Sequence, residues 1–145
     1  GAVPQDLSSI AWAVATSRTR DQSAYALLAK VSSEAQRKID EFVPQDIAMC
    51  AWSFAKVAAR DRQLLRLFAD RSVERVHELN GQNLANVVWS LATVHEMHEP
   101  LMTIIARTRA DTIQGLGPQE YSNIVWSFAT LKSLAKWTDA EILFR

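Results

Sequence analysis

The stretch NLANVVWSLATV, residues 83–94, decides the fold because the chain carries four near copies of it. The other copies are DLSSIAWAVATS at 6–17, DIAMCAWSFAKV at 46–57 and EYSNIVWSFATL at 120–131. Trp12, Trp52, Trp89 and Trp126 lie 40, 37 and 37 residues apart, and Gln5, Gln45, Gln82 and Gln119 keep the same three intervals. A period between about 20 and 50 residues is typical of a repeat array, in which each unit buries its apolar face against its neighbours.

Each copy predicts a helix. In the copy at 83–94 the apolar residues follow the i, i+3, i+4, i+7, i+8 spacing of a helix with one buried face: Leu84, Val87, Val88, Leu91 and Ala92. Trp89 widens this face beyond half of the circumference at about 100° per residue, which predicts that the helix packs between two neighbours. We therefore expect the four tryptophans to lie in the core between repeats rather than to stack on a ligand.

Start signals mark these first helices, and in each complete repeat unit a second helix follows the first. Each first helix is expected to follow a proline or glycine and to open with an acidic or amide residue, at Pro4 and Asp6, Pro44 and Asp46, Gly81 and Asn83, and Pro118 and Glu120. Second helices are expected over the apolar positions from Leu64 to Leu79 and from Leu101 to Leu116. The three extra residues of the first unit are expected in the turn RTRDQS at 18–23.

The predicted fold class is therefore all-α, an α-solenoid of tandem helix-turn-helix hairpins with a period of about 37 residues. The predicted boundaries are repeat 1 at 4–43, repeat 2 at 44–80, repeat 3 at 81–117 and a partial repeat 4 at 118–145. Because Arg145 falls inside the fourth repeat, we expect the chain to be a fragment of a longer array.

Composition narrows the possible functions. The 145 residues are 48% hydrophobic, and 16 Lys plus Arg balance 16 Asp plus Glu, so no net charge attracts nucleic acid or lipid without specific contacts. No apolar run approaches the length of about 20 residues that a membrane span needs. Cys50 is the single cysteine and occupies the slot of Ile10, Val87 and Ile124, so we expect a core side chain rather than a nucleophile.

Subtracting the buried arc from the first helices leaves a stripe of short, mostly uncharged polar groups. Such side chains suit the reading of base edges on a single strand of RNA. The candidate base-reading residues are Ser9, Thr16, Met49, Ser53, Lys56, Asn86, Ser90, Thr93, Asn123, Ser127 and Thr130. The alternative is an ordinary solvated helix face, since exposed surfaces are polar in any case.

The turns between the paired helices carry basic residues. Candidate contacts to phosphate are Arg18, Arg20, Arg60, Arg62, Lys132 and Lys136. Asp21, Asp61 and Asp139 stand among them, so a network of exposed ion pairs is the alternative.

The turn HEMHE at 95–99 is the one place where metal ligands gather in the sequence. Its spacing differs from HExxH and no further ligand stands nearby, so we expect a surface turn and no metal. No glycine-rich phosphate loop, serine elbow or Ser/His/Asp set is recognisable, and no small-molecule substrate is evident. The chain is therefore expected to have no enzymatic activity and no cofactor.

The pattern PQ[D/E]…[N/S]…W[S/A]…AT, most complete at 81–94 and 118–131, resembles the octotricopeptide-type (OPR-like) repeats of organellar RNA-binding proteins. Proteins of that class often also carry a RAP domain. The resemblance covers nearly the whole chain and implies paired helices, a mitochondrial or plastid location, and binding of organellar RNA in processing, stability or translation.

Two functions remain open from the sequence. The first is an RNA-binding module whose first-helix stripe reads a single strand. The second is a protein-binding or structural α-solenoid subunit of a large organellar assembly, such as a ribosome or a photosynthetic complex. The neutral charge favours the second function, and the polar stripe and the resemblance favour the first.

Overall fold

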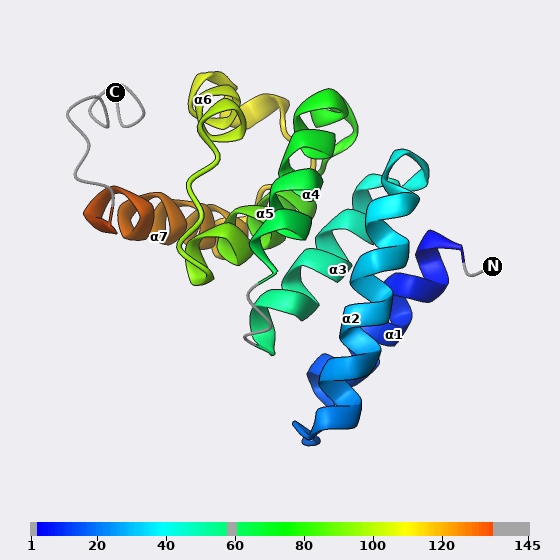
Figure 1. Cartoon of the computed structure of the whole chain (residues 1–145). Coiled ribbons are helices and arrows are strands. Elements are labelled where there is room, and N and C mark those ends of the chain that lie inside the picture. The colour runs from blue at the N-terminus through cyan, green and yellow to red at the C-terminus, as the bar shows by residue number, and fades with distance from the viewer. Residues whose placement is uncertain (1–2, 58–60, 135–145) are drawn as a thin grey trace.

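The computed structural model describes residues 3–57 and 61–134, and these residues form paired helices with no β-strand among them (Figure 1). The first helices are α1 Pro4–Thr16, α3 Pro44–Lys56, α5 Gly81–Thr93 and α7 Pro118–Leu134. The second helices are α2 Gln22–Arg37, α4 Arg62–Glu74 and α6 Glu99–Arg107. Each second helix is followed by a short 3₁₀ turn: η1 Ile39–Glu41, η2 Val76–Glu78 or η3 Ala110–Thr112. The predicted all-α class is confirmed.

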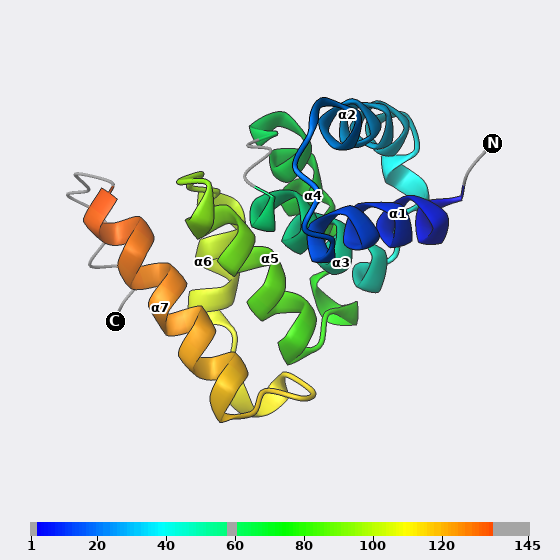
Figure 2. The same ribbon diagram turned by 90° about the horizontal axis from the view of Figure 1, so that it is seen from below.

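The helices are arranged in two rows that follow the chain. In the first row α1 contacts α3, α3 contacts α5, and α5 contacts α7. In the second row α2 contacts α4, and α4 contacts α6. The rows place α1 and α7 at opposite ends of the molecule, as the view in Figure 2 shows. Helices that share a slot in the repeat therefore lie next to each other.

The predicted first helices are confirmed, but each begins two residues before the predicted opening residue, at Pro4, Pro44, Gly81 and Pro118. Pro4 and Pro44 are the first residues of their helices, where the missing N–H of proline costs nothing. In α5 the start is reinforced by a reciprocal pair, because Asn83 N–H donates to Asn80 Oδ1 at 2.8 Å and Asn80 N–H donates to Asn83 Oδ1 at 3.2 Å.

Glycine replaces proline at position 81 for two reasons, a hydrogen bond of its N–H and a lack of space for a Cβ atom. Its N–H donates to the carbonyl of Gln114 at 2.7 Å, a bond that proline cannot make. A Cβ at this position would lie 2.5 Å from the carbonyl oxygen of Gly115 and 2.7 Å from Cα of Leu116. Gly115 itself has φ of 74°, which favours glycine. The start of α5 is thus held directly against the turn that leads into α7.

The second helices differ from the prediction in two ways. α4 ends at Glu74 and α6 ends at Arg107, so the segments up to Leu79 and Leu116 are not continuous helix. The extra residues of the first unit lie within α2, which has 16 residues where α4 has 13. Five residues separate α1 from α2 and five separate α3 from α4, so the prediction that the extra residues lie between the two helices was wrong.

The core lies between the two rows. Phe42, Phe54 and Phe68 are fully buried, and the rings of Phe42 and Phe68 lie 5.3 Å apart at 45°. Cys50 is fully buried among these apolar residues, and burial raises the pKa of its thiol. The prediction that Cys50 is a core side chain is confirmed.

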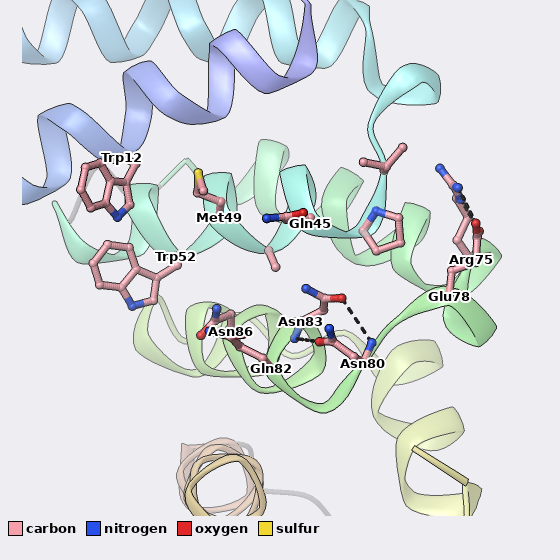
Figure 3. A pocket seen from close by; sticks show the side chains of 13 residues that line it. Trp12, Gln45, Met49, Trp52, Arg75, Glu78, Asn80, Gln82, Asn83 and Asn86 are labelled. Atoms are coloured by element: carbon pink, nitrogen blue, oxygen red, sulfur yellow. Dashed lines mark hydrogen bonds and ion pairs between the residues drawn. The ribbon is translucent and has the colours of Figure 1, made fainter. Parts of the chain in front are cut away.

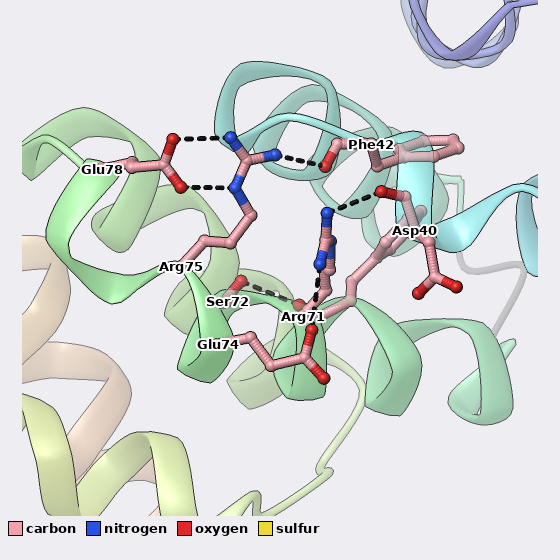
Figure 4. Close-up of polar contacts among 8 residues, drawn as sticks. Asp40, Phe42, Arg71, Ser72, Glu74, Arg75 and Glu78 are labelled. Carbon is pink, nitrogen blue, oxygen red and sulfur yellow. Dashed lines mark hydrogen bonds and ion pairs between the residues drawn. The ribbon is translucent and has the colours of Figure 1, made fainter.

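Two arginines of the second unit bind the backbone of the first (Figure 4). Arg71 Nη2 donates to the carbonyl of Asp40 at 2.6 Å, and Arg75 Nη1 donates to the carbonyl of Phe42 at 3.1 Å. Arg75 also binds the carboxylate of Glu78, with Nη2 at 2.6 Å from Oε1. These bonds satisfy carbonyls at the end of η1 and connect neighbouring units.

Candidate nucleic-acid interface

A groove of about 790 Å³ lies between α3 and α5, with Trp12 of α1 at its edge (Figure 3). The α3 side contributes Gln45, Met49 and Trp52, and the α5 side contributes Gln82 and Asn86. Asn80, Asn83 and the ion pair of Arg75 with Glu78 close one end. The volume falls in the range of about 300 to 1,000 Å³ that is common for ligand pockets.

Three side-chain amides in this groove have no hydrogen-bond partner among the described residues. Within residues 3–57 and 61–134, the side chains of Gln45, Gln82 and Asn86 make no hydrogen bond. Figure 3 shows them on facing helices around one space. Each amide offers two donors and one acceptor, so the set can bind the edges of bases or a peptide backbone.

The tryptophans are less buried than predicted. The prediction of a core position was wrong for Trp12 and Trp126, whereas Trp52 and Trp89 pack against the core between repeats. Trp12 is 48% exposed and Trp126 is 50% exposed, while Trp52 and Trp89 are half-buried although first helices flank both of them. The rings of Trp52 and Trp89 stack with centroids 6.4 Å apart at 30°. Trp52 and Trp89 thus pack against each other, and each of the four tryptophans keeps part of its side chain in solvent.

Three candidate base-reading residues are fully buried, and the prediction for them was wrong: Ser53, Ser90 and Ser127. Their hydroxyls donate to the carbonyls four residues earlier, at 2.8 Å to Met49, 2.6 Å to Asn86 and 2.7 Å to Asn123. A serine that is satisfied by its own helix can be buried without an unpaired donor. Ala13 holds the same slot in α1 and is exposed, so this slot faces the preceding first helix.

The remaining candidate base-reading residues are at least partly exposed. Met49 and Asn86 line the groove, and Lys56 holds its ammonium 5.6 Å from the ring centroid of Trp52. Thr16 turns its hydroxyl back to the carbonyl of Trp12 at 2.9 Å, which occupies its donor. The others lie along the same row of helices but outside the groove lining: Ser9, Thr93, Asn123 and Thr130.

The candidate phosphate contacts do not form a continuous basic edge in the described structure. Arg20 is bonded to the carbonyls that end α1, at 3.1 Å to Val14 and 2.9 Å to Ser17. Arg62 lies 3.8 Å from the carboxylate of Glu96, which Arg66 binds at 2.8 Å. Arg18 is exposed in the turn after α1, and Lys132 is exposed in the last turn of α7. Arg60 and Lys136 fall outside the described residues. Ion pairing and capping explain part of this basic edge.

The HEMHE turn has a structural role at His98. Its Nδ1 accepts the N–H of Leu101 at 3.2 Å, and its Nε2 lies 2.6 Å from Oδ1 of Asp70. The ring is buried and caps α6, so it joins α6 to α4. Among the described residues no three His, Cys, Asp or Glu side chains lie close enough together to hold a metal ion.

The glutamines of the groove are site residues that the sequence pattern did not predict. Gln45 and Gln82 recur in register with Gln5 and Gln119, but the spacing served only as a marker of the repeat. Gln82, Asn86, Trp89 and Thr93 follow i, i+4, i+7, i+11 and share one exposed face. The predicted stripe was rotated away from this face by about 50°, given about 100° per residue.

A sequence model of the RNA-editing substrate-binding complex 6 protein family matches residues 4–134. The match covers nearly the whole chain, which therefore belongs to this family. No curated protein matches the chain, and no solved structure matches it. No helix in the described ranges has both the length and the apolar character to cross a bilayer.

Proposed function

We propose that this member of the RNA-editing substrate-binding complex 6 protein family is a helical-repeat subunit that contacts single-stranded RNA and acts in RNA processing. The family description names a complex that binds RNA-editing substrates, which supports a role beside RNA. The observation that carries the proposal is the α3/α5 groove, where unoccupied amides from two first helices meet exposed tryptophan. Sequence-selective recognition of single-stranded RNA uses this combination of aromatic stacking and hydrogen bonds to base edges.

The repeat architecture is part of the proposal. First helices that contact each other in chain order support an α-solenoid with a period of about 37 residues. The relationship to octotricopeptide-type repeats, an organellar location and the absence of catalysis belong to the same proposal. In this arrangement each unit adds one first helix, and thus one glutamine, one variable residue and one tryptophan, to the exposed face.

The test is selection of bound sequences from a random single-stranded RNA pool at about 150 mM salt, where non-specific electrostatic attraction is reduced. We expect an enriched motif that changes in the Asn86→Ala variant. Ser90→Ala is the matched control, because Ser90 lies one turn further along α5 and is fully buried. Its enriched motif should equal that of the wild type. An absence of enrichment would refute sequence reading by this chain.

A second candidate function is a protein-binding scaffold within the same assembly. It is favoured because several arginines bind the protein's own backbone and do not form a basic surface for RNA. Arg20, Arg71 and Arg75 donate to backbone carbonyls, so their charges serve the fold. The amides of the groove suit an extended peptide as well as a base. For this function, purified partner subunits should bind the chain with equal affinity before and after ribonuclease treatment. Asn86→Ala should weaken that binding.

A further inference from the structure

We propose that the α3/α5 groove holds unpaired RNA bases by stacking on Trp12 and Trp52, with phosphate neutralisation contributing little to affinity. This inference rests on the proposed RNA function and adds how the RNA is held. The affinity for RNA should therefore require bases and aromatic side chains at these two positions, and it should change little with salt concentration.

Exposure of the aromatic row is the first argument. Trp12 lines the groove while half of its surface remains in solvent, and Figure 3 shows it beside Trp52 at the same end of the groove. Trp12 shares this lining with Val43, Met49 and Trp52, and a contiguous exposed apolar patch in a groove, unlike a single exposed side chain, marks an interaction site. An indole ring accepts any base, since every base presents a π-face for stacking.

The orientation of Trp52 is the second argument. The Trp52 ring stacks on the Trp89 ring with centroids 6.4 Å apart, and this contact holds the Trp52 ring in place. Trp52 is therefore a preorganised surface on which a base can stack. The ammonium of Lys56 lies 5.6 Å from its ring centroid and sits on a flexible, exposed side chain. A base that stacks on Trp52 can displace Lys56 toward the adjacent phosphate. This exchange replaces a cation–π contact by a stacked base and one ionic contact.

The charge of the groove is the third argument. Among the described residues that line the groove, Arg75 is the one cation, and it is paired with Glu78 and bonded to the carbonyl of Phe42. The lining therefore carries no net charge. Neutral amides and indole rings favour bases over phosphates. Among the described residues, Lys56 beside Trp52 is exposed and available to one phosphate.

The experiment measures binding of a fluorescein-labelled single-stranded RNA of about six nucleotides, a length within the range of single-strand sites. An abasic strand of equal length and charge is the matched ligand. We expect the abasic strand to bind about 25- to 10,000-fold more weakly, which corresponds to the loss of two bases stacked on Trp12 and Trp52 at about 5- to 100-fold each. For the base-bearing strand we expect log K to fall with log salt at a slope of about −0.7, the value for one phosphate on a single strand.

The variants isolate the groove. Trp12→Ala should weaken binding of the base-bearing strand by about 5- to 100-fold and leave the abasic strand unchanged. Trp12→Phe should restore most of the affinity. Trp126→Ala is the matched control, since Trp126 is equally exposed in the same repeat slot but lies outside the groove lining. Circular dichroism and thermal unfolding establish that each variant is folded.

Two results would overturn the inference, and they differ in what they say of the function. Equal binding of both strands with a slope steeper than about −2 would mean that phosphates carry the affinity. RNA binding would then stand, and the stacking site would not. No detectable binding of either strand would refute RNA contact itself and leave the protein-binding scaffold as the better function.

Discussion

Replacing Gly81 by alanine should destabilise the protein, although glycine-to-alanine changes in helices usually stabilise. The usual gain is about 0.4 to 1 kcal/mol, because alanine restricts the unfolded chain. At Gly81 the new Cβ would lie 2.5 Å from the carbonyl oxygen of Gly115 and 2.8 Å from its carbonyl carbon. Both atoms are backbone, so relief requires movement of the turn before α7.

The expected net loss is about 1 to 3 kcal/mol, the typical cost of forcing extra atoms into a packed site. For a chain of this length that corresponds to a fall in Tm of roughly 3 to 9 °C. Urea unfolding followed by far-UV circular dichroism measures the loss. Gly117→Ala is the control, since its Cβ would meet only the mobile carboxylate end of Glu120, at 2.8 Å. Equal stability of the Gly81→Ala variant and the wild type would refute this account of how α5 and α7 are joined.

Three further predictions concern the first-helix row. Trp89→Ala should lower the unfolding free energy by about 2 to 3 kcal/mol in urea titration, less than for a fully buried tryptophan, because Trp89 is half-buried and stacks on Trp52. Cys50 should resist iodoacetamide in the native protein and react once urea unfolds the chain, as mass spectrometry would record, because burial raises the pKa of its thiol and disfavours the thiolate. Burial also raises the pKa of the Asp46 carboxyl in the folded protein, so folding favours its protonated form. The stability gained from this protonation is complete below the unfolded-state pKa of about 3.9 and is lost as pH rises through the folded-state pKa. Asp46→Asn, which introduces the residue found at Asn83, should therefore increase stability at neutral pH, and urea titrations should show the gain disappearing in acid.

The repeat made the helix order predictable from the sequence. Four copies in register fix where each first helix begins, and Pro4 and Pro44 mark those starts by a local rule that packing does not override. The ends of the second helices depend on tertiary contacts instead. Arg71 and Arg75 bind carbonyls of the preceding unit near the point where α4 gives way to η2, and no local pattern encodes those bonds.

The face of the first helices could be predicted only approximately. Ser90 looked like a surface residue because it is polar, yet its hydroxyl is satisfied by Asn86 within the helix, so burial leaves no unpaired donor. Trp89 looked like a core residue because it is large, yet an indole can pack along one side and remain partly in solvent. Because residues were assigned to the surface by their polarity, the predicted stripe of RNA-binding residues lay to one side of the exposed face. It therefore omitted Gln82, which lines the groove together with Asn86.

The distribution of charge determines what this chain can add to an RNA-binding assembly. Arg20, Arg71 and Arg75 donate to backbone carbonyls, and Arg62 and Arg66 converge on Glu96, so these guanidinium groups hold helices together. A chain with no net charge gains little affinity from phosphates without specific contacts. Under the proposed function, basic subunits elsewhere in the assembly would hold the RNA backbone, and the groove would contribute selectivity for bases. Tethering makes this division effective, because a weak contact acts at a high effective concentration once its partner subunit holds the same strand. The isolated chain should therefore bind short RNA weakly but selectively, and its contribution should appear in the assembly as a change in sequence preference at nearly constant total affinity.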